Sequence, residues 1–189
     1  VRAQKGGMDG VELHVGHGYL PQQFLSPYAN IRTDDYGGSF ENRTRLLLQV
    51  TRAVREVWPE RLPLFVRISA TDWLPGPAWD IEQSVTLAHK LKAEGVDLVD
   101  CSSGGLAPEQ QIPLQPGYQV PFAQRIRQEA SIATGAVGLI SEARQAEAIV
   151  RAGEADAVLI ARQSLRDPYW PLRAARELGV TPAIPTQYG

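Results

Sequence analysis

The sequence predicts an α/β fold, namely the later part of a (β/α)8 barrel, about strands 4 to 8, with the N-terminal strands absent. Short aliphatic and β-branched runs alternate with longer segments of helical period, which is typical of a parallel sheet covered by helices. Long segments rich in Gly, Pro and aromatic residues follow the predicted strands, whereas the segments that enter strands are short. In a barrel, the segments that follow strands build the active site.

The predicted strands carry unlike faces. In the second of them, Arg67 lies on the face opposite Val66 and Ile68, and in the first, His14 lies opposite the apolar residues. A doubly wound open sheet would show the same alternation of elements, but a polar inner face favours the barrel. Because a whole barrel takes about 250 residues, we expect residues 1–189 to form a single partial barrel domain, truncated at its N-terminus. The five predicted strands are residues 11–15, 64–69, 97–101, 136–139 and 157–161.

Capping residues and apolar stripes predict the helices. Asp80 is the expected N-cap of one helix, with Gln83 in the reciprocal capping position and Gly95 as its end. Ser141 is the expected N-cap of a later helix, and an apolar stripe at residues 47, 50, 54 and 57 predicts an earlier one. Residues 1–7 resemble the end of a helix and its glycine stop, so we expect the chain to begin partway through a longer one.

Composition excludes several classes of protein. With 43% hydrophobic and 21% charged residues the chain has enough apolar surface for one core, and its net charge of -2 gives no general attraction to nucleic acid or anionic membranes. A single cysteine rules out an internal disulfide framework and any multi-cysteine metal site. Since no apolar run approaches the roughly 20 residues that span a bilayer, we expect a cytoplasmic protein that binds neither membrane nor nucleic acid.

The strongest local signal is His14-Val15-Gly16-His17-Gly18-Tyr19 at the end of a predicted strand. The two glycines allow the chain to turn, so that both imidazoles can converge on one oxygen atom of a ligand, and the Tyr19 hydroxyl adds a proton donor. A zinc site is the rival interpretation, but no third ligand stands at a familiar spacing. The structural alternative is that one histidine is exposed, the other belongs to the core, and neither binds a ligand.

Three other groups of residues suggest an anionic or electron-rich ligand. Arg67 would place a guanidinium inside the barrel, either facing such a ligand or paired with Glu12. The last two predicted strands end in small residues, which include Gly138 and Ala161, and Arg162 follows directly. Small residues let backbone N–H groups approach an anion, and barrels often bind phosphate at this place. The alternative is that these residues only allow tight packing where a strand turns into a helix. Ser103, in a Ser-Ser-Gly-Gly segment after a strand, offers further polar contacts or only a flexible turn.

Together these residues resemble a known family. Residues 14–20, 24–27, 30, 32–39 and 41–43 look like the old yellow enzyme family, also described as NADH:flavin oxidoreductases or ene-reductases. Residues 65–69, 100–104 and 165–168 are similar to its thermophilic-like branch, which includes xenobiotic reductases. The resemblance covers essentially the whole chain and corresponds to the C-terminal portion of the family.

The resemblance implies an FMN-binding TIM barrel that reduces activated C=C bonds, in enones and related α,β-unsaturated or nitro compounds, by ping-pong hydride transfer from NAD(P)H. It assigns His14 and His17 to the substrate's oxygen, and Tyr19 to the substrate pocket as a candidate catalytic proton donor, a role for which another tyrosine before residue 1 competes in this branch. It places Arg67 against the N1/C2=O edge of the flavin. The remaining expected cofactor contacts are Ser103, Gly138, Ala161 and Arg162. The expected full-length form is a homo-oligomer without a metal.

Departures from the family pattern keep other interpretations open. Ala161 stands where many relatives have glycine, and the chain stops at Gly189, short of the tail in which this branch often supplies an arginine to a neighbouring subunit. With the first strands absent, the chain is alternatively a non-catalytic half-barrel that cannot hold FMN by itself. Another phosphate-binding barrel, such as an isomerase or aldolase, is the third interpretation, although no lysine stands at a strand end for Schiff-base chemistry.

Overall fold

A single five-stranded parallel sheet forms the centre of the computed structural model, which describes residues 1–188. The strands stand in chain order, each hydrogen-bonded to the next, as successive βα units do in a barrel. This arrangement confirms the predicted class, a partial parallel α/β barrel. The strands are β1 (Val11–Val15), β2 (Leu64–Ser69), β3 (Leu98–Ser102), β4 (Ala133–Ala136) and β5 (Ala157–Val158).

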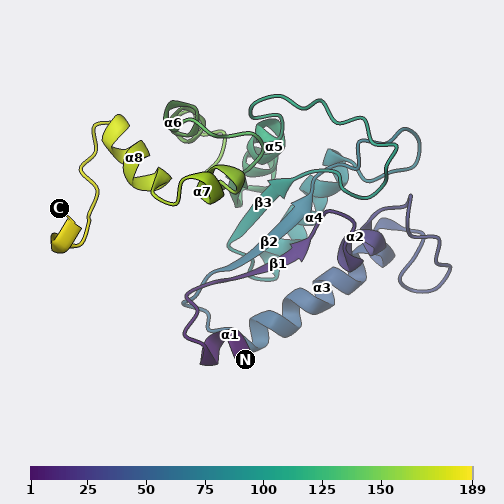
Figure 1. Cartoon of the computed structure of the whole chain (residues 1–189). Helices are drawn as coiled ribbons and strands as arrows, with labels where there is room; N and C mark the ends of the chain where they lie inside the picture. The colour runs from purple at the N-terminus through teal and green to yellow at the C-terminus, as the bar shows by residue number, and fades with distance from the viewer. Residues whose placement is uncertain (189) are drawn as a thin grey trace.

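Helices connect the strands and cover one face of the sheet. The four connecting helices, in chain order, are α3 (Phe40–Val57), α4 (Ile81–Ala93), α5 (Val120–Ala130) and α6 (Ala143–Arg151). The other helical segments are α1 (Arg2–Lys5), α2 (Leu20–Leu25), α7 (Arg162–Arg166), α8 (Trp170–Glu177) and a 3-10 turn at Thr186–Tyr188. Figure 1 shows α3 running alongside the sheet, with α8 and the C-terminus at the opposite end of the molecule from α2.

The apolar core lies between the sheet and these helices. Leu64, Val66 and Ile68 on one face of β2 are buried and belong to the same cluster as Leu47 of α3 and Leu91 of α4. The opposite face of β2 carries Phe65 and Arg67, which are only partly buried. This difference confirms the predicted alternation of an apolar face toward the helices and a polar face toward the barrel interior.

The last three strands differ from the prediction. β3 lies one residue later than expected at both ends, and Asp97, just before it, uses its carboxylate to accept the backbone N–H of Leu64 at 2.8 Å. β4 is Ala133–Ala136 and not residues 136–139, since Leu139 has a φ of 52°, which ends an extended strand. β5 ends at Val158, three residues before the expected 161.

The predicted helix starts are partly correct. Asp80 caps α4 by accepting the backbone N–H of Gln83 at 2.8 Å, but the Gln83 side chain donates to the carbonyl of Ala78 and does not complete the reciprocal pair. Glu142, not Ser141, precedes the first residue of α6, and its side chain makes no capping bond. Helix α2 lies inside a segment predicted to be a loop, and α5, α7 and α8 were not predicted.

Truncation of the core should test how far the partial barrel behaves as one cooperative unit. Leu91 is fully buried, so Leu91→Ala is expected to lower the free energy of unfolding by about 2 to 5 kcal/mol through lost burial and a residual cavity. Denaturant unfolding followed by circular dichroism measures the change. Leu165→Ala, at a side chain that is 84% exposed, is the control and should change stability by less than about 0.5 kcal/mol.

Candidate functional site

The candidate site lies at the carboxyl ends of β1, β2 and β3. His14 is near the end of β1, and the backbone then turns, because His17 has a φ of 55° and Gly18 a φ of 78°. Gly16 allows the turn to lie directly on β2, where an added Cβ would come within 2.9 Å of Ser69 Oγ. The turn brings the ring centroids of His14 and His17 to 5.2 Å, so the predicted convergence of the two imidazoles is present.

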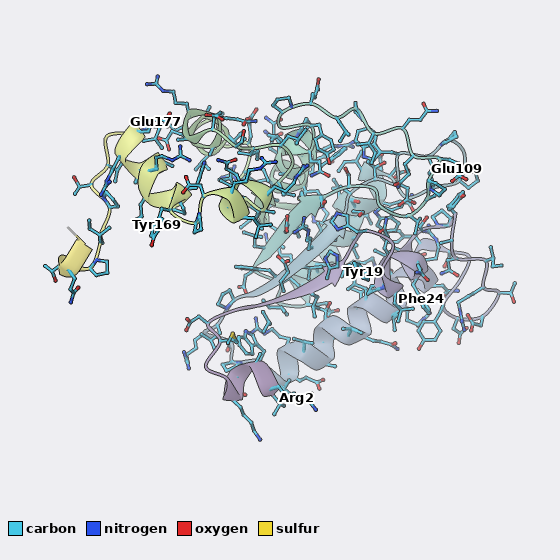
Figure 2. All side chains as sticks on the ribbon, in the orientation of Figure 1. Arg2, Tyr19, Phe24, Glu109, Tyr169 and Glu177 are labelled. Atoms are coloured by element: carbon cyan, nitrogen blue, oxygen red, sulfur yellow. The ribbon has the colours of Figure 1, made fainter. Side chains whose placement is uncertain are left out.

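Tyr19 completes this group of side chains. Its ring meets that of His14 edge to face, with centroids 4.9 Å apart and an interplanar angle of 66°. The side chain is exposed, and Figure 2 shows it beside the end of β1, at the start of α2. Its hydroxyl is therefore free to meet a ligand that approaches the two histidines. We name His14, His17 and Tyr19 the clamp.

His17 is held by the two neighbouring strands. Its backbone N–H donates to Ser69 Oγ at 3.0 Å, and its Nε2 lies 2.6 Å from Ser102 Oγ. Burial, with the positive charge of Arg67 and then His14, lowers the pKa of His17 to about 4, and burial with Arg67 also lowers the pKa of His14. Both imidazoles are therefore neutral near pH 7, and a neutral imidazole offers one N–H donor to a ligand oxygen without carrying a charge.

Arg67 lies beside Asp100 and not beside Glu12, the partner of the alternative structural interpretation. In the sheet register His14 stands opposite Arg67, and Arg67 stands opposite Asp100, whereas Glu12 stands opposite Phe65. Arg67 Nε lies 3.3 Å from Asp100 Oδ2, outside hydrogen-bond geometry, and neither that Nε nor either Asp100 oxygen has a hydrogen-bond partner within residues 1–188. The guanidinium is therefore partly uncommitted and is free to contact a ligand above the sheet.

Asp100 is a residue of the candidate site that the sequence prediction did not include. Its side chain is fully buried. Burial raises its pKa to about 7, Arg67 opposes the rise and Glu12 adds to it. Asp100 and Ser102 are two residues apart on β3 and therefore share one face, which the sequence could have indicated. Only the register of the strands shows that Asp100 faces Arg67.

Ser103 is already engaged by protein groups. Its hydroxyl accepts a hydrogen bond from Trp73 Nε1 at 2.8 Å and donates one to Gln119 Oε1 at 2.6 Å. Gln119 in turn donates through Nε2 to the carbonyl of Val137, which links the segment after β3 to the segment after β4. These contacts leave the Ser103 oxygen at most one further acceptor position for a ligand.

The three residues expected at a phosphate end lie together. Gly138, Ala161 and Arg162 line a cavity of about 350 Å³ at the carboxyl ends of β4 and β5. Arg166 of α7, which the sequence reasoning missed, lines it too, so two guanidinium groups border the cavity and no carboxylate does among its lining residues. Gly138 has a φ of 121°, and a Cβ there would lie 2.7 Å from Gln119 Nε2. These features fit a bound phosphate group.

The described residues contain neither a metal-binding cluster nor a helix that could cross a membrane. Within residues 1–188 no group of three or more His, Cys, Asp or Glu side chains is arranged to hold a metal ion, which leaves the zinc interpretation of the histidine pair without a third ligand. Over the same residues, none of the helices combines the length and apolar character needed to cross a bilayer.

Comparison with known proteins gives a consistent result. Residues 1–180 match the NADH:flavin oxidoreductase / NADH oxidase family. An NADPH dehydrogenase of Geobacillus sp. (strain WCH70) is 54% identical over 187 residues, which cover 99% of this chain and 54% of that protein. An NADPH dehydrogenase of Halalkalibacterium halodurans is 52% identical over 188 residues, which cover 100% of this chain and 54% of that protein. The chain therefore spans about half the length of the curated relatives it matches.

Solved structures are similar over almost the whole chain. Morphinone reductase in complex with tetrahydroNAD is 29% identical with a TM-score of 0.74, over 99% of this chain and 48% of that chain. An old yellow enzyme homologue from Zymomonas mobilis is 26% identical with a TM-score of 0.74, over 96% of this chain and 50% of that one. 2-Naphthoyl-CoA reductase is 27% identical with a TM-score of 0.83, over 94% of this chain and 27% of that one.

The buried Asp100 carboxyl should make stability depend on pH. Because its folded-state pKa is raised to about 7, above the ordinary value near 3.9, the folded protein holds this proton more tightly than the unfolded chain does. The resulting stabilisation is complete below about pH 4 and is lost as the pH rises through about 7. The side chain of Asp100→Asn cannot titrate. The free energy of unfolding of the wild type minus that of the variant should therefore decrease as the pH rises over that range.

Denaturant unfolding of both proteins at half-unit intervals between pH 4 and 8 measures this difference. Subtracting the variant cancels the titration of groups that the substitution does not touch. Parallel curves over the whole range would contradict a buried carboxyl with a raised pKa.

Proposed function

The chain belongs to the NADH:flavin oxidoreductase / NADH oxidase family, and on that premise we propose that its parent protein reduces activated C=C bonds with NAD(P)H. Membership confirms the predicted resemblance to old yellow enzyme relatives, and with it FMN as the family's cofactor and NAD(P)H as its co-substrate. The finer proposal concerns the substrates, which are enones and related α,β-unsaturated or nitro compounds, and the ping-pong order of the two half-reactions.

The observation that carries this proposal is the convergence of the clamp at the end of β1. Two neutral imidazoles with ring centroids 5.2 Å apart can both direct an N–H at one carbonyl or nitro oxygen when His17 carries its proton on Nδ1 and its Nε2 accepts from the Ser102 hydroxyl. Such donors stabilise the negative charge that develops on that oxygen when the β-carbon of an enone accepts a hydride. Tyr19, edge-on to His14 and exposed, is positioned to give a proton to the α-carbon.

The remaining predicted residues fit an FMN molecule lying across the ends of the strands. When bound, FMN supplies the hydride chemistry, by accepting a hydride from NAD(P)H and delivering it to the substrate. The cavity at Gly138, Ala161 and Arg162 would hold the phosphate, with Arg166 as a second cation. Arg67 would direct positive charge at the electron-rich edge of the ring, and Ser103 would contribute a polar contact through its remaining acceptor position or its backbone.

A second candidate function is a non-catalytic half-barrel. Within the described residues β1 and β5 are the two edges of the sheet, and Glu12 and His14 on the inner face of β1 are exposed. Unpaired strand edges favour self-association or pairing with a complementary half.

In the leading proposal residues 1–189 are one partial FMN-binding domain of a cytoplasmic homo-oligomer.

A visible spectrum distinguishes the two candidates. If the chain holds FMN, the purified protein is expected to be yellow, to bleach when NADPH is added without oxygen, and to regain its colour with cyclohexenone. A colourless protein that also fails to take up added FMN would support the half-barrel and contradict FMN binding by this polypeptide.

Substitution of one clamp residue should separate the two half-reactions. In the parent protein, His14→Ala is expected to slow reoxidation by an enone, and to weaken binding of phenol, by about 10- to 100-fold. That range corresponds to losing a hydrogen bond to a developing charge, about 1.5 to 3 kcal/mol. Reduction by NAD(P)H should change far less, because the lost N–H serves the oxygen of the substrate.

Stopped-flow absorbance of each half-reaction makes the measurement. The matched control is His89→Ala, at an exposed histidine of α4, which should leave both rates unchanged. Equal losses in the two half-reactions would contradict the role assigned to His14.

A further inference from the structure

A fully buried carboxyl group lies behind the clamp and is held by neutral hydrogen-bond donors, with Arg43 near enough to interact with it only through its charge. Asp72, on the segment after β2, accepts three hydrogen bonds: from Gln22 Nε2 at 2.9 Å, from Ser26 Oγ at 2.5 Å and from the backbone N–H of Trp79 at 2.9 Å. All three donors are neutral, and among residues 1–188 no ion pair includes Asp72. A carboxyl group buried in this way is retained only where its hydrogen bonds are satisfied, so the three donors are constrained to their positions.

The first of these donors connects Asp72 to the clamp. Gln22, a buried residue of α2, donates through Nε2 to Asp72 and accepts the backbone N–H of Gly18 through Oε1 at 2.6 Å. Gly18 stands between His17 and Tyr19 in the sequence. The amide of Gln22 therefore transmits the position of Asp72 to the backbone that carries two of the three clamp residues.

The backbone carbonyl of Asp72 begins a second connection. It accepts a hydrogen bond from Gln110 Nε2 at 2.6 Å, and Gln110 Oε1 accepts the backbone N–H of Gly105 at 2.7 Å. Gly105 packs directly against the clamp, because an added Cβ there would lie 2.6 Å from His17 Cα. The two connections thus reach the His17–Gly18 backbone from two sides, one through α2 and one through the segment after β3.

We propose that Asp72 is the positioning residue of the clamp, acting through Gln22 and Gln110 to set the places of His17 and Tyr19. The carboxylate itself does not contact the ligand. The effect of Asp72 on turnover rests on the proposed function. Its effect on the position of the clamp backbone depends only on contacts within this chain. The two effects can therefore be tested separately.

Amide hydrogen exchange of the chain without added cofactor tests the effect on the clamp backbone. Gln22→Met is close in size and removes only the first connection, so exchange at the Gly18 amide should become about tenfold faster while the Gly105 amide is unchanged. Gln110→Met should give the reverse pattern. Asp72→Asn keeps the backbone carbonyl that accepts from Gln110, so it should accelerate exchange at Gly18 more than at Gly105. If that variant fails to fold, the two glutamine variants still decide the matter.

The control is Thr51→Val, which removes a buried hydroxyl of α3 that bonds only to its own helix. It should leave both glycine amides unchanged. Unaltered exchange at Gly18 in Gln22→Met would overturn the proposal.

Half-reaction kinetics of the FMN-loaded parent protein test the effect on turnover. Gln22→Met and Gln110→Met should each weaken phenol binding and slow reoxidation by cyclohexenone by about tenfold, with less than twofold change in reduction by NADPH. A general loss of structure would slow both half-reactions and release FMN, so this split identifies positioning. Faster exchange at Gly18 with unchanged phenol binding would overturn the positioning role, whereas absence of enone reduction in the wild type would overturn only the proposed function.

Discussion

One row of side chains across three strands determines the chemistry of the inner face of the sheet. The parallel register places His14, Arg67 and Asp100 opposite one another on β1, β2 and β3. Burial, assisted by the single guanidinium in this row, lowers the pKa of both clamp histidines. Burial also raises the pKa of Asp100, and the same guanidinium opposes that rise. Burial and this one charge together keep the imidazoles neutral. The guanidinium remains available to a ligand, because its Nε, 3.3 Å from Asp100 Oδ2, does not form a hydrogen bond with it.

Close approach of backbone segments holds the clamp above this row. Gly16 lies against β2 and Gly105 lies against His17, and neither position has room for a Cβ. His17 itself adopts a left-handed conformation, which a non-glycine residue does at some energetic cost. That conformation persists because its backbone N–H and its imidazole are both bonded, to Ser69 and Ser102 respectively.

The sequence predicted some parts of this structure better than others, for physical reasons. β1 and β2 were located to the residue because large apolar side chains occupy every second position on one face of each strand, whereas Thr134 and Gly135 of β4 are too small to give such a signal. The clamp could be foreseen because its residues are close in sequence. The partner of Arg67 could not, since sheet register is a tertiary property, and the same holds for the contact between Asp72 and Gln22, which are 50 residues apart.

The sequential order of the strands has a consequence for how the chain acquires its structure. Within residues 1–188 each strand pairs with its neighbours in the sequence and with no strand from further along. Every pairing step therefore closes only the connection of one βα unit, and the entropy lost in closing a loop grows slowly with its length. During synthesis each unit can dock on the preceding one as it leaves the ribosome, so the sheet can grow from β1 toward β5 without waiting for the C-terminus.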